Sequence, residues 1–301
     1  MKRLLLAVSL TLVACSEQIQ NSPETTGVKQ TTTSAPYQTI SIVAVGDIAC
    51  STSQREAGSS DCEDIAVANL ARGMNPNYVF ALGDIQYNAH SESDFQENFG
   101  KYWADMLPIT KPVAGNHEYA MSGASGYFST WTKYSQEGYY SFTVGDKWLV
   151  VALNTNDECR YVGCSDGSEQ YEWLKNELTT NADRCVIALG HHPRFSSGAH
   201  GDTEAVSDIY DLMSSYDVSL YLSGHDHHYE RIENPNSPRQ YVVGTGGKDL
   251  RSAGNPTQGS AKIIDDSHGV LVMDIMGSTI HERFVSISGE ILDSETTICY
   301  R

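Results

Sequence analysis

Five short apolar runs of this chain each end in a glycine that is followed by an aspartate, an asparagine or a histidine. These groups are Gly46-Asp47, Gly83-Asp84, Gly115-Asn116-His117-Glu118, Gly190-His191-His192-Pro193 and Gly224-His225-Asp226-His227-His228. Glycine lets the backbone turn sharply at the end of a strand, and ligands of α/β sheets bind beyond the carboxyl ends of the strands. We therefore expect the five groups to converge on one site, so the fold must bring five strand ends together.

The segments between these groups alternate between strand-like and helix-like patterns. Runs rich in Val, Ile, Leu and aromatic residues predict buried strands at residues 41–45, 78–82, 185–189 and 218–222. Apolar residues at helical spacing predict helices at residues 61–73, 168–180 and 202–215. This alternation predicts a mainly α/β architecture.

Two other regions are typical of antiparallel β-structure. Residues 138–156 contain two β-rich runs separated by Gly145-Asp146, which predicts a hairpin. Residues 239–247 and 268–292 are predicted to form successive antiparallel strands. The sequence has no detectable repeat, so a two-sheet sandwich with outer helices fits better than a solenoid or a barrel.

The N-terminal segment has the pattern of an export signal. Lys2 and Arg3 precede an apolar stretch that is too short to span a bilayer as a mature helix. Its end, Leu12-Val13-Ala14-Cys15, resembles a bacterial lipoprotein cleavage box, and an ordinary signal peptide with a cysteine in its apolar region is the alternative. We predict a signal peptide at residues 1–14 and a lipidated Cys15 whose acyl chains anchor the protein in a membrane.

Residues 15–37 are predicted to form a flexible tether. This stretch is rich in Ser, Thr, Gln and Glu and nearly free of apolar side chains, so it buries too little surface to offset the entropy lost on ordering. The protein is therefore expected to be exported and membrane-anchored, in the periplasm or at the outer membrane or cell surface.

The remaining six cysteines are predicted to form disulfides, because an even number in an exported chain indicates a disulfide framework. Sequence alone leaves the connectivity open. We favour the two pairs that close short loops and then the pair that remains, namely Cys50–Cys62, Cys159–Cys164 and Cys185–Cys299. Buried free thiols are the alternative, and the absence of a Cys-x-x-Cys pair argues against a zinc ribbon.

The charge balance of the chain argues against one class of partner. The formal net charge is −18, from 38 acidic and 20 basic residues, which is the wrong sign for a protein that neutralises nucleic-acid phosphates. No nucleic-acid binding is expected, and a small phosphorylated substrate would need local positive charge from bound metal ions. The spacing of His225 and His227 suits metal binding, because alternate residues of an extended segment face the same way and two imidazoles from one segment can chelate.

The ordered glycine-led groups resemble those of the calcineurin-like metallophosphoesterases over residues 40–250. The resemblance implies a metallophosphoesterase domain at residues 38–301, with a four-layer αββα sandwich of two mixed β-sheets flanked by helices. The family usually begins with Asp-x-His, whereas Ala49 stands at the histidine position here. The purple acid phosphatase branch lacks this histidine and has Gly-Asp-x-x-Tyr in its second group, which matches Gly83 to Tyr87. A buried packing aromatic is the alternative for Tyr87.

Carried over residue by residue, the resemblance implies a dinuclear metal centre. The first ion would be held by Asp47, Asp84, Tyr87 and His227. The second would be held by Asp84, Asn116, His191 and His225. A phenolate suits Fe(III), so the resemblance implies Fe(III) at the Tyr87 site and a divalent Fe, Zn or Mn ion at the second site. His192 would lie outside the ligand set.

Such a centre implies hydrolysis of phosphate monoesters by attack of a metal-bound hydroxide on phosphorus. His117 and His200 resemble two substrate-facing catalytic histidines of the branch, with His117 contacting the phosphoryl group and protonating the leaving oxygen. A solvent-exposed loop histidine is the alternative for His200, and Glu118 is expected to orient His117. Other functions left open are a phosphodiesterase or nucleotidase with the same metal site and a non-catalytic surface binding lipoprotein, although the complete ligand set argues against the last.

The stretch Gly244-Thr245-Gly246-Gly247 is predicted to be a turn near the site. It could be mistaken for a phosphate-cradling loop, but it lacks the Lys-Ser/Thr of a P-loop and the helix pattern of a dinucleotide fold.

Overall fold

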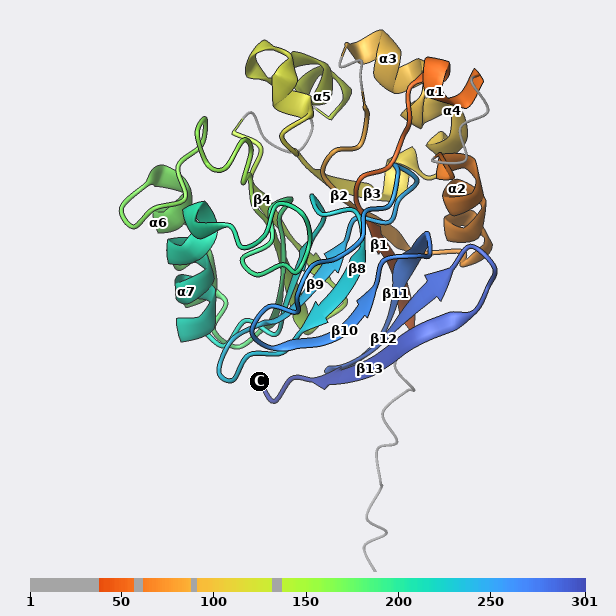
Figure 1. The fold of residues 1–301 in the computed structure, drawn as a ribbon. Coiled ribbons are helices and arrows are strands. Elements are labelled where there is room, and N and C mark those ends of the chain that lie inside the picture. Colours follow the sequence, from red (N-terminus) through yellow and green to blue (C-terminus); the bar gives the residue numbers. More distant parts are fainter. Residues whose placement is uncertain (1–37, 57–61, 88–90, 132–136) are drawn as a thin grey trace, which may run out of the picture. The chain divides into compact units, whose positions relative to one another are not determined.

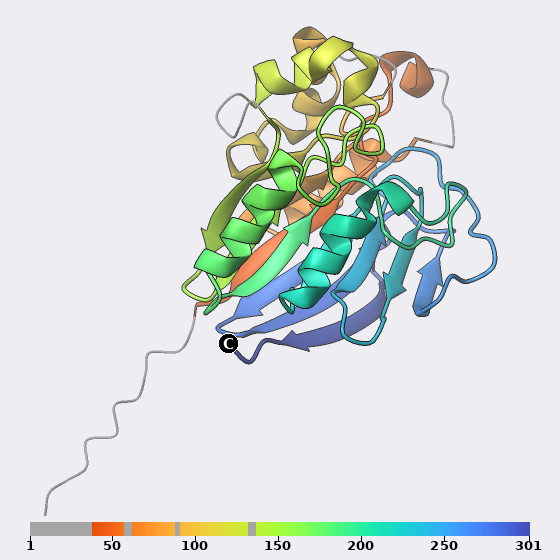
Figure 2. The same ribbon diagram turned by 90° about the vertical axis from the view of Figure 1, so that its left-hand side faces the viewer.

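Two mixed β-sheets pack face to face and carry helices on their outer faces (Figure 1 and Figure 2). This architecture is that of a computed structural model, which describes residues 38–56, 62–87, 91–131 and 137–301. The predicted signal peptide, lipidated Cys15 and tether lie outside the described residues, so they stay predictions. Among the helices that the structure describes, none combines the length and the apolar character needed to cross a membrane.

The first sheet has six strands in the order β13-β12-β11-β1-β2-β3. Its parallel strands are β1 (Ile40–Val45), β2 (Tyr78–Leu82) and β3 (Thr110–Val113). Its antiparallel strands are β11 (Gly269–Met276), β12 (Thr279–Ser286) and β13 (Ile291–Ile298). Because β11 pairs antiparallel with β1, the C-terminal strands extend the sheet that the N-terminal strand begins.

The second sheet has seven strands in the order β10-β8-β9-β7-β6-β5-β4. Its parallel strands are β5 (Trp148–Ala152), β6 (Cys185–Leu189), β7 (Leu220–Ser223) and β9 (Arg239–Val243). Its antiparallel strands are β4 (Tyr140–Val144), β8 (Tyr229–Ile232) and β10 (Ser260–Ile264). The predicted hairpin is confirmed as β4 and β5. The prediction of purely antiparallel strands from residue 239 is wrong for β9, because β9 lies between β8 and β7 and runs parallel to β7.

Helices cover the outer side of each sheet (Figure 1). On the side of the six-stranded sheet lie α1 (Thr52–Glu56), α2 (Asp64–Gly73), α3 (Glu92–Glu97), α4 (Phe99–Trp103) and α5 (Ser125–Thr130). On the side of the seven-stranded sheet lie α6 (Glu169–Thr180) and α7 (Ser207–Ser215). Short 3₁₀ helices are η1 (Leu107–Ile109), η2 (Glu118–Ala120), η3 (Ser122–Ala124) and η4 (Glu204–Val206).

Helix α6 begins where the sequence predicts it, whereas helix α7 begins later than predicted. Ser168 caps α6, because its hydroxyl oxygen accepts a hydrogen bond from the N–H of Tyr171. The helix predicted at residues 202–215 begins later, as η4 followed by α7. The reason is that the Asp202 carboxylate accepts a hydrogen bond from the N–H of Ser196 at 2.9 Å instead of capping a helix.

Three buried apolar layers confirm the predicted four-layer sandwich. The middle layer lies between the sheets and contains Phe80 and Leu271 from one sheet and Trp148 and Tyr241 from the other. One outer layer packs α2 to α5 on the six-stranded sheet, and the other packs α6 and α7 on the seven-stranded sheet. Burial of this apolar surface is the main favourable contribution to folding.

The three favoured disulfides are confirmed as Cys50–Cys62, Cys159–Cys164 and Cys185–Cys299. The last spans 114 positions and ties β6 to the residue after β13, so it links the two sheets covalently. In the chain-entropy description a longer closed loop removes more freedom from the unfolded chain. Cys50, Cys62 and Asp64 are close enough to hold a metal ion, but both sulfur atoms are used in the disulfide, so this group is not a metal site.

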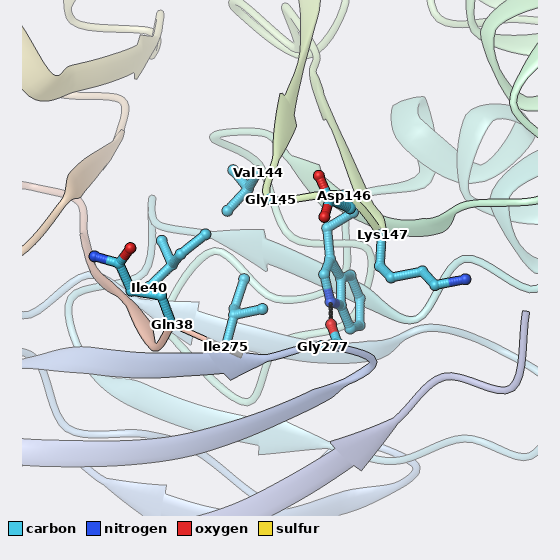
Figure 3. A pocket seen from close by; sticks show the side chains of 9 residues that line it. Gln38, Ile40, Val144, Gly145, Asp146, Lys147, Ile275 and Gly277 are labelled. Atoms are coloured by element: carbon cyan, nitrogen blue, oxygen red, sulfur yellow. Dashed lines mark hydrogen bonds between the residues drawn. The ribbon is translucent and has the colours of Figure 1, made fainter. Parts of the chain in front are cut away.

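A cavity of about 180 Å³ lies at the end of β1 that is opposite to Asp47. It is lined by the start of β1, by the turn between β4 and β5, and by Ile275 and Gly277 (Figure 3). Trp148 Nε1 donates a hydrogen bond to the main-chain oxygen of Gly277 at 2.9 Å. Since its lining residues include no histidine or cysteine, the strand ends at the other edge remain the candidate site.

Glu282 of β12 is a fully buried carboxyl group in the core between the sheets. It lies on the same face of β12 as the core residues Ile280 and Phe284. Arg239 Nη1 lies 3.9 Å from Glu282 Oε1. Burial raises the pKa of Glu282, and the neighbouring Thr297 and Arg239 offset only part of this rise.

Glu282→Gln is expected to stabilise the protein at pH 7 to 8 and to have little effect near pH 4. Because the folded-state pKa lies above the unfolded value, the unfolded chain loses its proton first as the pH rises, and the stability of the wild type falls. We expect a gain of about 1 kcal/mol in the free energy of unfolding at pH 7 to 8, or about 2–4 °C in Tm. Thermal unfolding at both pH values measures this gain in stability, and the exposed Glu290→Gln is the control. The same gain at both pH values, or in both variants, would contradict this account.

Candidate metal centre

The five predicted groups meet where the carboxyl ends of the parallel strands of both sheets come together. The six-stranded sheet supplies Asp47 after β1, Asp84 and Tyr87 after β2, and Asn116 after β3. The seven-stranded sheet supplies His191 after β6, and His225 and His227 after β7. The sheets touch directly at this edge, because the main-chain N–H of His225 donates a hydrogen bond to Asp47 Oδ2 at 2.8 Å.

One set of side-chain atoms surrounds the hydroxyl oxygen of Tyr87. Tyr87 Oη lies 2.7 Å from Asp47 Oδ1 and 3.2 Å from Asp84 Oδ2. It also lies 3.1 Å from His227 Nε2, which is 3.4 Å from Asp47 Oδ1. Ligand atoms that bind one cation at about 2.1 Å and at right angles lie about 3 Å apart. These four atoms therefore have the spacing of a single coordination sphere.

A second set surrounds the side-chain oxygen of Asn116. Asn116 Oδ1 lies 3.1 Å from His191 Nε2 and 3.1 Å from His225 Nδ1. His191 Nε2 also lies 3.3 Å from Asp84 Oδ1. Asp84 thus presents one carboxylate oxygen to each set, which is the arrangement of a carboxylate shared by two neighbouring cations.

Main-chain carbonyl groups orient two of these histidines. His191 Nδ1 lies 2.8 Å from the main-chain oxygen of Leu82, and His227 Nδ1 lies 2.7 Å from that of Asp249. A carbonyl oxygen only accepts hydrogen bonds, so Nδ1 is the donor in both rings. Each Nε2 therefore points toward the candidate ligand atoms, as in metal-binding histidines whose other nitrogen is held by the protein.

The backbone of the site is strained at three non-glycine residues with positive φ. These are Asp47 at 59°, Asp84 at 45° and His225 at 73°. The carboxylates also pack against glycine backbone: a Cβ atom on Gly115 would lie 2.2 Å from Asp84 Oδ1, and one on Gly224 would lie 2.5 Å from Asp47 Oδ2. The glycines thus leave room for the carboxylates at the strand ends.

The charges of the site fit a cation. Burial alone would raise the pKa of Asp84, but His191 and His117 hold it below its ordinary value. Burial and the two carboxylates raise the pKa of Tyr87, so without a cation Tyr87 keeps its proton and donates it to Asp47. Burial would lower the pKa of His191, whereas Asp84 raises it to about 9. Protons on Tyr87 and His191 therefore balance the buried carboxylates, and a bound cation would displace them.

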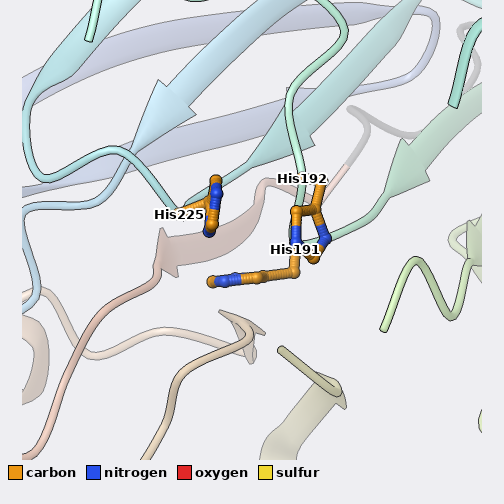
Figure 4. A group of neighbouring side chains, drawn as sticks. All are labelled: His191, His192 and His225. Atoms are coloured by element: carbon orange, nitrogen blue, oxygen red, sulfur yellow. The ribbon is translucent and has the colours of Figure 1, made fainter. Parts of the chain in front are cut away.

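His192 lies in one cluster with His191 and His225 (Figure 4). Its hydrogen bonds differ from those of the candidate ligands. Thr155 Oγ1 accepts hydrogen bonds from the main-chain N–H groups of His191 and His192, both at 3.1 Å. Its own proton is then directed to His192 Nδ1, 3.0 Å away. Burial lowers the pKa of His192, so the ring is neutral and its proton is on Nε2. With a proton there and a hydrogen bond on Nδ1, His192 has no free lone pair for a metal.

Glu118 has a role that the sequence did not predict. Its buried carboxylate accepts hydrogen bonds from the main-chain N–H groups of Asp84 at 3.0 Å, Ile85 at 2.9 Å and Gly115 at 2.7 Å. These contacts fix the two turns that carry Asp84 and Asn116, and the orientation of His117 by Glu118 stays a prediction.

The two predicted catalytic histidines lie beside the candidate ligands and are partly exposed. The side chain of His117 is 36% exposed, and its ring centroid lies 4.4 Å from that of Tyr87. The side chain of His200 is 40% exposed, and its ring centroid lies 4.2 Å from that of His225. Both rings can therefore contact a substrate bound over the candidate metal site.

Asp226, for which the sequence predicts no role, connects His200 to the site. Asp226 is fully buried, and Asp226 Oδ1 accepts hydrogen bonds from the N–H of His200 at 3.0 Å and from His200 Nδ1 at 2.8 Å. The hydroxyl group of Ser196 donates to its other oxygen. The place of Asp226 between His225 and His227 put it beside the predicted site. The backbone bends there, with a φ of 73° at His225, so the direction of its carboxylate did not follow from the alternation of a strand.

Comparison with known proteins agrees with this geometry. The family model described as calcineurin-like phosphoesterase matches residues 40–229. Tartrate-resistant acid phosphatase type 5 of Mus musculus is 27% identical over 246 residues, which cover 70% of this chain and 74% of the mouse protein. Purple acid phosphatase 17 of Arabidopsis thaliana is 23% identical over 289 residues, which cover 86% of this chain and 84% of the plant protein.

A solved structure shares the fold. The purple acid phosphatase PPD1 isolated from yellow lupin (Lupinus luteus) seeds matches with a TM-score of 0.69 at 19% identity. The match covers 86% of this chain and 54% of the lupin chain, so this chain spans about half of the lupin protein's length. Because the family model extends from β1 to β8, more than half of the chain, this protein belongs to the calcineurin-like phosphoesterase family and has purple acid phosphatases among its relatives.

Proposed function

We propose that this phosphoesterase hydrolyses phosphate monoesters with two metal ions that share Asp84. The proposal is based on the two candidate ligand sets, one around Tyr87 Oη and one around Asn116 Oδ1. Within each set, neighbouring ligand atoms lie 2.7 to 3.4 Å apart. In this proposal the first ion is held by Asp47, Asp84, Tyr87 and His227. The second ion is held by Asp84, Asn116, His191 and His225.

The chain's own residues would orient the ester and handle its protons. Two bound metal ions supply a nucleophile derived from water at mild pH and stabilise negative charge on the phosphoryl oxygens. His117 follows Asn116 directly, so its partly exposed ring can donate a hydrogen bond to a phosphoryl oxygen. In place of His117, which the family resemblance implied as the proton donor, His200 would protonate the leaving oxygen. Asp226 accepts the Nδ1 proton of His200 and favours the doubly protonated ring, whose second proton, on Nε2, is then free to be donated.

Hydrolysis of p-nitrophenyl phosphate and of its diester, bis-p-nitrophenyl phosphate, tests this function. Protein reconstituted with metal is expected to hydrolyse the monoester much faster than the diester. Similar rates on both would favour a phosphodiesterase with the same metal site. Fewer than one metal ion per chain together with no hydrolysis of any phosphate ester would overturn the enzyme proposal and leave a surface binding protein.

We also propose Fe(III) at the Tyr87 site and a divalent ion at the other. Tyr87 is buried, and its pKa is raised when no cation is bound. To bind a metal it must lose its proton, so the ion must be one that strongly stabilises a phenolate. Tyr87→Phe is therefore expected to abolish a visible tyrosinate-to-Fe(III) absorption band and to lower kcat/KM about tenfold. Absorption spectra with metal analysis measure both, and the buried Tyr119→Phe is the matched control that keeps the band. An active but colourless wild type would point to zinc or manganese instead.

We propose that the protein is exported and anchored through a lipid on Cys15. The sequence pattern of the first residues supports this, and so do the three disulfides, since disulfides persist in oxidising compartments. Fractionation of cells that express Cys15→Ser tests the anchor, because the variant should leave the membrane fraction. Unchanged membrane retention would count against it.

A further inference from the structure

The segment that follows the predicted glycine turn packs along the ligand set around Tyr87. The N–H of Lys248 donates a hydrogen bond to the main-chain oxygen of Asp47 at 3.1 Å. The main-chain oxygen of Asp249 accepts one from His227 Nδ1 at 2.7 Å. Two consecutive residues therefore hold two candidate ligands of the first ion.

The side chain of Lys248 contacts a third candidate ligand. Lys248 Nζ lies 5.5 Å from the centroid of the Tyr87 ring. The Tyr87 side chain is buried, and the Lys248 side chain is only 14% exposed and also pairs with the carboxylate of Asp249. A cation within about 6 Å of an aromatic centroid is attracted to the ring, and the attraction grows as water is excluded.

This placement has an electrostatic consequence for a metal bound through Tyr87. A nearby positive charge lowers the energy of electrons on a phenolate, and it acts more strongly in a partly buried site than in water. More energy is then needed to move an electron from the phenolate to the metal.

We propose that Lys248 is a positioning residue of the metal centre that holds the Tyr87 ring and tunes the bond between tyrosine and metal. It raises the energy of the tyrosine-to-metal charge transfer. The inference rests on the proposed Fe(III) at Tyr87 and goes beyond it, because it concerns a residue outside the ligand sets.

Lys248→Met tests the inference, since it removes the charge and keeps most of the side-chain volume. The charge-transfer band is expected to move to longer wavelength. Lys248→Arg keeps the charge and should behave like the wild type. The matched control is Lys101→Met, because Lys101 Nζ lies 5.4 Å from the ring of Tyr102, which is not a ligand candidate.

Asp249→Asn gives a second test with the opposite sign. It removes the negative charge that partners Lys248, so the band should move to shorter wavelength. This variant keeps the inference testable if Lys248→Met does not fold.

The outcomes separate this inference from the proposed function. A purple, active wild type whose Lys248→Met and Asp249→Asn spectra match that of Lys101→Met would overturn the role of Lys248 alone. A colourless wild type would overturn Fe(III) at Tyr87 and the role of Lys248 with it, while monoester hydrolysis by that protein would still support the phosphatase proposal.

Discussion

Asp84→Asn is expected to lose both metal ions and at least about a thousandfold of kcat/KM. Asp84 Oδ2 lies 3.2 Å from Tyr87 Oη, and Asp84 Oδ1 lies 3.3 Å from His191 Nε2, so Asp84 reaches both ligand sets. Asparagine keeps the shape of the side chain but replaces one of these oxygens with an NH₂ group, which has no lone pair for a cation. Since bound ions contribute several kcal/mol to charge stabilisation, losing the shared ligand costs both binding and rate.

Metal content per chain and kcat/KM for p-nitrophenyl phosphate measure this effect. The control is Asp274→Asn, which removes a carboxylate that pairs with Arg283 on the neighbouring strand β12. We expect the control to keep two ions and activity within about twofold, because surface ion pairs contribute little. An Asp84→Asn variant that retains two ions and normal activity would show that Asp84 is not shared between the ions.

The positions of the candidate ligands could be predicted because one rule of sheet geometry governs them. Buried parallel strands have their carboxyl ends at one edge, so polar residues placed just after glycine meet there. The strands that end at Val45, Leu82 and Leu189 are short apolar runs that the sequence pattern reveals. Tyr87 required the family resemblance, since no periodicity places a residue five positions after a strand.

The contacts that complete the site could not be predicted from the same pattern. Lys248 reaches Tyr87, and Asp226 reaches His200, across loops whose course depends on many weak contacts. The buried carboxylate of Glu118 binds the backbone of the neighbouring group, which its position beside His117 does not reveal. The spacing of residues in the sequence predicts which side chains are neighbours along one strand or helix. It does not predict which side chains of two different loops come into contact.

The short helices over the six-stranded sheet were also missed, for a physical reason. Helices α3 and α5 have six residues each, which is less than two turns. An amphipathic pattern becomes visible only over about three turns, so these segments look irregular in sequence. Their buried aromatic residues, such as Phe95 and Tyr127, pack on the sheet and hold them in place.

His200→Asn is expected to lower kcat/KM about a hundredfold for an alkyl phosphate and much less for p-nitrophenyl phosphate. An alkoxide is a poor leaving group that needs a proton as the bond to phosphorus breaks, whereas p-nitrophenolate leaves without one. Asp226→Asn should show the same dependence on the leaving group with a loss of about tenfold, because Asp226 acts only through the Nδ1 atom of His200.

Rates for both esters in the single variants and the double variant test this assignment, with metal content measured in each because Asp226 lies between His225 and His227. The matched control is His281→Asn, a histidine of β12 whose ring contacts Thr296, and it should match the wild type on both esters. If His200 donates the proton, the double variant should be no slower than His200→Asn, since the role of Asp226 disappears with the ring that it holds. Equal losses on both esters would instead assign His200 to substrate binding, and the proton would then have to come from His117.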